Sequence, residues 1–96
     1  MSWHDFDGGS TVREISFEGG EIIKDEEFDL AARITLEKLS DGDYSVTCGV
    51  YGTFFHTAWF HELEKYDLMK SDIEEILTQE NEDDYYRSIE EFTDKY

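Results

Sequence analysis

The stretch that most constrains the fold runs from residue 31 to residue 60. Apolar and polar residues alternate over residues 32–37, and residues 44–50 repeat the same period of two. Such alternation places one set of side chains on each face of a strand. Asp41-Gly42, between the two runs, supplies the positive φ angles of a tight hairpin turn. The sequence therefore predicts an antiparallel hairpin at the centre of a sheet.

A third run, Thr53 to Phe60, is almost entirely apolar and rich in aromatic residues. In a strand, Phe55 and Trp59 share one face. The other face then carries Phe54, His56, Ala58 and Phe60. Because both faces are apolar, we expect a central strand or one that is covered on both sides. The chain is expected to reverse at Tyr51-Gly52, since glycine favours turns.

The N-terminal third predicts two further strands. Residues 1–10 are expected to form an irregular lead-in, with Trp3 and Phe6 against the sheet. β-Branched residues then predict a first strand at 11–17, and 21–28 is expected to return as the second.

After Phe60 the apolar spacing changes to three and four residues, which is the stripe of an amphipathic helix. The stripe consists of Leu63, Tyr66, Met69, Ile73, Ile76 and Leu77. It predicts a single helix from about Glu62 to Gln79. The alternative is a helix that starts or restarts at the capping box Ser71–Glu74.

Residues 81–84 have the composition of a helix N-cap and predict a last helix. Tyr85, Ile89, Phe92 and Tyr96 form its apolar seam. We expect this seam to pack on the protein's own core; the alternative is a homodimer or partner surface. Strands followed by helices predict one α+β domain over residues 1–96, with an antiparallel sheet of about five strands and two C-terminal helices on one face.

The formal net charge of −17 limits the function classes. Acidic residues outnumber basic ones in both halves of the chain, so the charge covers the whole domain. Such a surface repels nucleic acids and anionic membranes and attracts basic proteins or cations. The alternative explanation is solubility alone. Since aromatic residues make up 16% of the chain, it has the means to build a core despite this charge.

The cysteine content and the N-terminal sequence indicate a cytoplasmic protein. Cys48 is the only cysteine, so no internal disulfide is expected, which fits a reducing compartment. The first residues lack the basic start and apolar core of a signal peptide. No run approaches the ~18 apolar residues that a membrane helix needs.

Chemical motifs are sparse. His56 and His61 are five residues apart and lack the spacing of a helical zinc site. Cys48 is expected to be a buried small apolar residue, with a neighbouring His56 as the base of a thiol enzyme in the alternative. His56 is expected to be satisfied by a backbone or tyrosine partner. We predict no catalytic residue, no metal site and no cofactor.

The segment ARITLEKLSDGDYSVTCGVYGTFFHTAWF, residues 32–60, resembles small uncharacterised bacterial proteins. The resemblance covers about the middle third of the chain and includes Cys-Gly-Val-Tyr-Gly. It implies a bacterial cytoplasmic origin and no particular activity.

The leading hypothesis is a small acidic, non-catalytic module that binds a basic protein, in the manner of an inhibitor, immunity protein or antitoxin. The candidate contacts are Asp25, Glu26, Glu27 and Asp29 in a first acidic cluster, and Glu82, Asp83 and Asp84 with Tyr85 and Tyr86 in a second. Acidic residues beside aromatic ones combine electrostatic steering with buried anchors. The first cluster is also typical of a solvated strand edge that discourages self-pairing. The alternatives are a structural homodimer through the last helix and a metal- or thiol-dependent enzyme that uses Cys48, His56 and His61.

Overall fold

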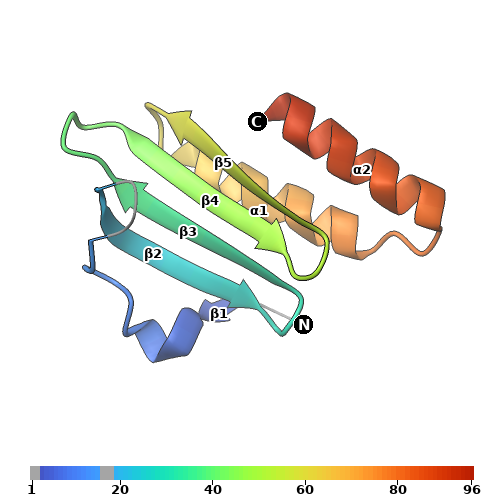
Figure 1. Ribbon diagram of the computed structural model, residues 1–96, viewed down its shortest axis with the longest axis horizontal. Helices are drawn as coiled ribbons and strands as arrows, with labels where there is room; N and C mark the ends of the chain where they lie inside the picture. Colours follow the sequence, from blue (N-terminus) through green and yellow to red (C-terminus); the bar gives the residue numbers. More distant parts are fainter. Residues whose placement is uncertain (1–2, 16–18) are drawn as a thin grey trace.

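Each strand of the sheet pairs with the strand next to it in the sequence (Figure 1). The computed structural model describes residues 3–15 and 19–96. The strands are β1 (Trp3–Asp5), β2 (Glu21–Phe28), β3 (Ala32–Lys38), β4 (Tyr44–Val50) and β5 (Phe54–Phe60), all antiparallel and in the spatial order β1-β2-β3-β4-β5. The helices α1 (Glu64–Leu77) and α2 (Glu82–Lys95) follow, and a short 3-10 turn, η1 (Phe6–Gly9), follows β1. The predicted α+β class is confirmed.

The two predicted hairpin turns are present. Gly42 has a φ of +92°, and the turn closes through the Leu39 N–H, which donates to the Asp43 carbonyl at 2.8 Å. At the second turn Gly52 has a φ of +75°. Glycine adopts such angles without the steric cost that a Cβ brings. These turns fix the register that places Ile34 opposite Cys48.

The first strand is not where the sequence placed it. Residues 11–13 form a turn, and Arg13 has a φ of +78°, which a strand cannot accommodate. Only Ile15 bridges to β2, and residues 16–18 lie outside the described residues. The strand predicted from the β-branched residues of 11–17 is therefore absent over the described residues 11–14.

The outer strand is instead β1, in the segment expected to be irregular. It has three residues, and Trp3 pairs directly with Phe28 on β2. The two rings meet edge to face with centroids 5.2 Å apart. The prediction that Trp3 lies against the sheet is confirmed, and the aromatic contact contributes about 1 kcal/mol beyond area burial.

β5 is an edge strand, so the prediction of a central strand or one covered on both faces was wrong. In the described part of the chain it pairs only with β4. Its two apolar faces have different roles. Phe54 and His56 lie under Phe92 of α2, whereas Phe55 and Trp59 face away from the helices.

The core lies between the sheet and α1, which is a single helix through Ser71, so the alternative start there was wrong. Figure 1 shows α1 behind the sheet and α2 beside β5. The buried side chains are Phe28, Ala32, Ile34, Leu36, Val46, Cys48, Val50, Ala58, Tyr66, Met69, Ile73, Ile76 and Phe92. Each large apolar side chain buried here contributes about 1.5–3 kcal/mol. The α2 seam also packs on this core, as predicted.

Candidate functional site on the open sheet face

The sheet face opposite the helices, called the open face below, carries every second residue of β3, β4 and β5, and β2 follows the same alternation except at a bulge between Ile22 and Lys24. The strand register arranges these residues in rows across the sheet. The rows are Glu27–Arg33–Gly49–Phe55, Asp25–Thr35–Thr47–Thr57 and Ile22–Glu37–Ser45–Trp59. The open face is therefore polar over the middle strands and aromatic along β5.

Asp25 is a fully satisfied buried carboxylate at one side of the open face. It is 1% exposed and accepts two hydrogen bonds from Arg33, at 2.9 Å from Nε and 2.6 Å from Nη2. The hydroxyls of Thr11 and Thr35 donate to it at 2.7 and 2.9 Å. Burial by itself would raise the pKa of Asp25, but the hydrogen bonds from Arg33 and the two threonines hold it below its usual value.

Glu37 is buried to a similar degree in a different environment. It is 4% exposed, and the Ser45 hydroxyl donates to its Oε2 at 3.2 Å. Among the residues that the structure describes, no lysine, arginine or histidine forms an ion pair with it. Two neighbouring strands therefore hold two buried carboxylates, one with a cation and one without.

The aromatic side of the open face depends on Gly49. A Cβ at this position would lie 2.6 Å from the Phe55 ring and 2.8 Å from the Phe54 carbonyl oxygen. The absence of that Cβ lets the ring lie directly on the β4 backbone, as aromatic residues do beside strand glycines. Phe55 is 77% exposed and Trp59 58% exposed, so both rings are available to a partner.

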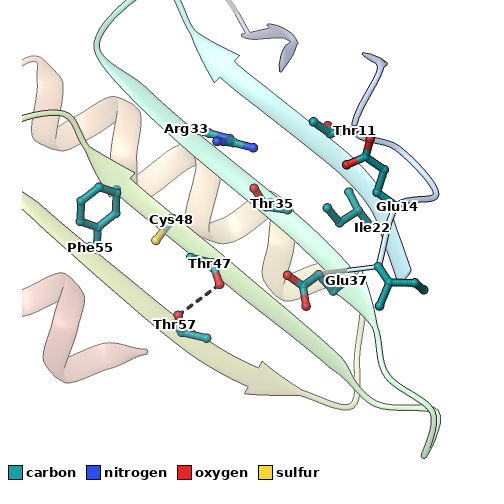
Figure 2. A pocket seen from close by; sticks show the side chains of 12 residues that line it. Thr11, Glu14, Ile22, Arg33, Thr35, Glu37, Thr47, Cys48, Phe55 and Thr57 are labelled. Atoms are coloured by element: carbon teal, nitrogen blue, oxygen red, sulfur yellow. Dashed lines mark hydrogen bonds between the residues drawn. The ribbon is translucent and has the colours of Figure 1, made fainter. Parts of the chain in front are cut away.

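A shallow concavity of about 540 Å³ lies on the open face (Figure 2). Its lining includes Glu14 and Ile15 on one side, Thr47 on β4, and Phe55 and Thr57 on the edge strand β5 at the other side. The two threonine hydroxyls are hydrogen-bonded to each other at 3.1 Å. In Figure 2 the labelled side chains of β3, β4 and β5 lie to one side of the N-terminal segment that holds Thr11 and Glu14.

The first predicted acidic cluster makes internal contacts, so the interpretation as a solvated edge was wrong. β2 is not an edge, because β1 pairs with it. Glu26 lies on the helix face and accepts hydrogen bonds from Tyr66 at 2.6 Å and Lys70 at 3.0 Å. Glu27 accepts one from Tyr51 at 2.6 Å, and burial together with this bond raises the pKa of Tyr51 to about 12. Asp25 is buried and already accepts four hydrogen bonds, from Arg33, Thr11 and Thr35, so it has little left to offer a partner.

The remaining candidate contacts are more accessible. Asp29 lies in the β2–β3 turn with a φ of +48°, and Glu82, Asp83 and Asp84 are exposed in the first turn of α2. Tyr85 is half-buried with its hydroxyl 3.1 Å from that of Thr53, whereas Tyr86 is exposed. The β4–β5 turn thus contacts both acidic clusters. Tyr51 bonds to Glu27 of the first cluster, and Thr53 lies within hydrogen-bond distance of Tyr85 of the second. Their role in partner binding stays a prediction.

The residues of the enzyme alternative are not assembled into one site. Cys48 is buried on the helix face, where burial raises the pKa of its thiol to about 12. His56 is its neighbour on β5, but the predicted hydrogen-bond partner of His56 is missing, because no described residue satisfies its buried Nε2. His61 is exposed and bonded to Asp43 at 2.6 Å. The thiol is therefore protonated at neutral pH and has no exposed face.

The described residues contain neither a cluster of metal ligands nor a helix suited to cross a membrane. No three histidine, cysteine, aspartate or glutamate side chains of residues 3–15 and 19–96 are placed to hold a metal ion together. No helix in the same ranges has the length and apolar character needed to cross a membrane.

Comparison with family models, curated proteins and solved structures finds no match to this chain. The resemblance of residues 32–60 to small bacterial proteins therefore stays a prediction.

The sequence reasoning missed Glu37 and the concavity as functional candidates. A usable signal was present, because the polar members of two alternating runs, Arg33 to Glu37 and Ser45 to Gly49, must share one face of a hairpin. The same argument correctly placed Phe55 and Trp59 on one face of their strand. What it lacked was the knowledge that the helices leave this face uncovered.

Proposed function

We propose that this chain is a small, acidic, non-catalytic module that binds a basic protein, as an inhibitor, immunity protein or antitoxin does. The observation that carries the proposal is the open face, where Phe55 and Trp59 are exposed on a chain of net charge −17. Large exposed rings grouped on one face of a small protein are typical of an interaction surface.

The charge and the rings have separate roles in this proposal. The negative surface speeds the encounter with a positively charged partner and repels nucleic acids and other acidic proteins. The rings supply the apolar area that holds the complex once water leaves the interface. The α2 seam that the sequence offered for a homodimer packs on β5, so the proposal places the partner on the open face.

Affinity capture tests this function. The immobilised full chain should retain a basic protein from its source lysate at about 50 mM salt and release much of it at about 500 mM, since salt screens exposed charges. Changing Phe55 and Trp59 to serine together should abolish capture. The matched control changes Leu30 and Leu68, two exposed apolar residues elsewhere, to serine and should retain the partner.

Two results contradict the proposal. One is a captured partner that is acidic or that is retained equally at both salt concentrations. The other is equal capture by the open-face variant and by the wild type, which would show that the exposed rings have no part in binding.

A further inference from the structure

We propose that the concavity on the open face binds an arginine side chain of the basic partner, with Glu37 as the carboxylate that receives it. This inference rests on the proposed function and names the contact at its centre. It follows from the charge of Glu37, from the shape and rigidity of the concavity, and from the position of Phe55.

The charge of Glu37 is the first argument. Glu37 is 4% exposed, but its one side-chain hydrogen bond within the described chain comes from the neutral Ser45 hydroxyl. All eight lysines and arginines lie in the described residues, and none forms an ion pair with Glu37. A buried carboxylate without a cation is costly, whereas Asp25 beside it has both Arg33 and two hydroxyls. A cation from outside would supply what Glu37 lacks.

The concavity next to Glu37 is already formed in the free protein. One wall is the segment from Thr11 to Ile15, which is fixed to β2 by two backbone bonds. The Arg13 N–H donates to the Ile22 carbonyl at 2.6 Å, and the Ile22 N–H donates to the Glu14 carbonyl at 2.9 Å. A site that is formed in advance loses less entropy when a ligand binds. Its volume of about 540 Å³ is large enough for an extended side chain and the backbone beside it.

The charges around the concavity favour a cation. Glu14 and Glu37 both line it. The one cationic residue in its lining, Arg33, is neutralised by Asp25 at 2.6 Å and has its guanidinium 3.6 Å from the centre of the Phe6 ring. Arg33 therefore does not cancel the negative field from Glu14 and Glu37, because its own charge is already matched.

The chemistry favours arginine over lysine. A guanidinium is planar, forms two parallel hydrogen bonds with a carboxylate, and stacks on aromatic faces. Phe55 lines the concavity and is largely exposed, and Gly49 leaves room for its ring to approach the β4 backbone closely. Thr47 and Thr57 add hydroxyl oxygens that can accept the remaining guanidinium protons. A lysine ammonium has no plane to stack and retains its water more strongly.

Nuclear magnetic resonance on the full chain tests the site with three capped peptides: tri-arginine, tri-lysine and tri-citrulline, the neutral isostere of tri-arginine. We expect tri-arginine to shift the amide signals of Thr35, Thr47, Thr57 and Phe55. It should bind about fivefold tighter than tri-lysine, and tri-citrulline should not bind, because only arginine combines charge with a stacking plane.

Matched variants assign the effect to Glu37. Glu37→Gln should weaken tri-arginine binding about tenfold, as the loss of one charge-assisted pair does. Glu90→Gln removes one exposed charge from α2 and should change binding less than about twofold. If Glu37→Gln does not give a folded spectrum, Phe55→Ala at the exposed rim should weaken binding about threefold through lost stacking.

Two outcomes overturn the arginine site. One is a set of signal shifts centred on Glu82, Asp83 and Asp84 of α2. The other is a Glu37→Gln variant that binds tri-arginine as tightly as the wild type does. Either result leaves the proposed function standing, since a basic partner would then dock elsewhere. Failure of the proposed function is a separate result, in which no basic protein is captured and neither cationic peptide binds at low salt.

Discussion

At the scale of single residues, Asp25 and Glu37 show how one alternating pattern produces two different carboxylates. Both are polar residues at open-face positions, and both are buried. Asp25 lies one strand from Arg33 and next to the segment that holds Thr11, so it is saturated with donors. Glu37 lies one row further along the strands, and among the described residues its side chain accepts a hydrogen bond from Ser45 alone. The first therefore stabilises the fold, and the second is the carboxylate that we propose as the arginine acceptor.

Asp25→Asn should lower the free energy of unfolding at pH 7 by about 2 kcal/mol, less than for a fully buried pair because Arg33 is partly exposed. The folded-state pKa of Asp25 is lowered, so its stabilising effect is complete above the unfolded-state pKa and is lost as pH falls through the folded-state pKa. The gap in the free energy of unfolding between wild type and variant, measured by urea unfolding, should thus shrink as the pH falls from about 5 to about 2. Asp94→Asn, an exposed control with the same charge change, should show no such gap. A gap that is constant with pH would contradict this account.

At the scale of elements, the two helices begin in different ways. Asn81 caps α2, because its side-chain oxygen accepts the N–H groups of Asp83 at 2.9 Å and Asp84 at 3.3 Å. The three acidic residues of this first turn also face the positive end of the helix dipole. α1 has no side-chain cap, and the capping-box sequence at Ser71 lies inside the helix. Tertiary packing of Met69 and Ile73 holds that helix together instead.

Asn81→Ala should therefore lower the free energy of unfolding by about 1 kcal/mol, since two amide groups lose their acceptor. Ser71→Ala should leave stability unchanged or raise it slightly, because alanine is the better helix former at an exposed interior position. Urea unfolding followed by circular dichroism measures both variants. A loss of about 1 kcal/mol from Ser71→Ala would indicate that a helix starts at Ser71 after all.

At the scale of the whole molecule, repulsion between unpaired acids opposes the fold. The described residues include 24 of the chain's 25 acids, and four of these 24 form ion pairs with lysine or arginine. Most acidic side chains therefore face solvent or other acidic side chains. Net charge of this size keeps a protein soluble and monomeric at the cost of stability.

Added salt should raise the melting temperature, by roughly 5 °C between about 20 and 300 mM sodium chloride, because screening weakens this repulsion. Differential scanning calorimetry measures the shift. A variant with Glu90→Gln and Glu91→Gln has less charge to screen and should show a smaller rise. A melting temperature that falls from low to moderate salt would run against the prediction.

The parts of the fold that were predictable depend on short-range sequence patterns. β2 to β5 and both helices follow from alternation, turn glycines and helical stripes. β1 was not predictable, because three residues carry no periodicity and its position depends on Trp3 meeting Phe28 from the far side of a loop. The candidate site was predictable only in part, because a local pattern shows which residues share a face but not which residues meet across strands. Local pattern placed Phe55 and Trp59 on one face, but the partners of Asp25 and Glu37 depend on contacts between strands.

The order of the strands along the chain has a consequence for synthesis. Because every strand pairs with its sequence neighbour, β2 to β5 can assemble hairpin by hairpin as the polypeptide leaves the ribosome, without waiting for distant segments. α2, which covers Phe54 and His56, emerges after all five strands. Until then the growing sheet exposes aromatic rings on both faces, and we expect the net charge of −17 to oppose association of nascent chains through electrostatic repulsion.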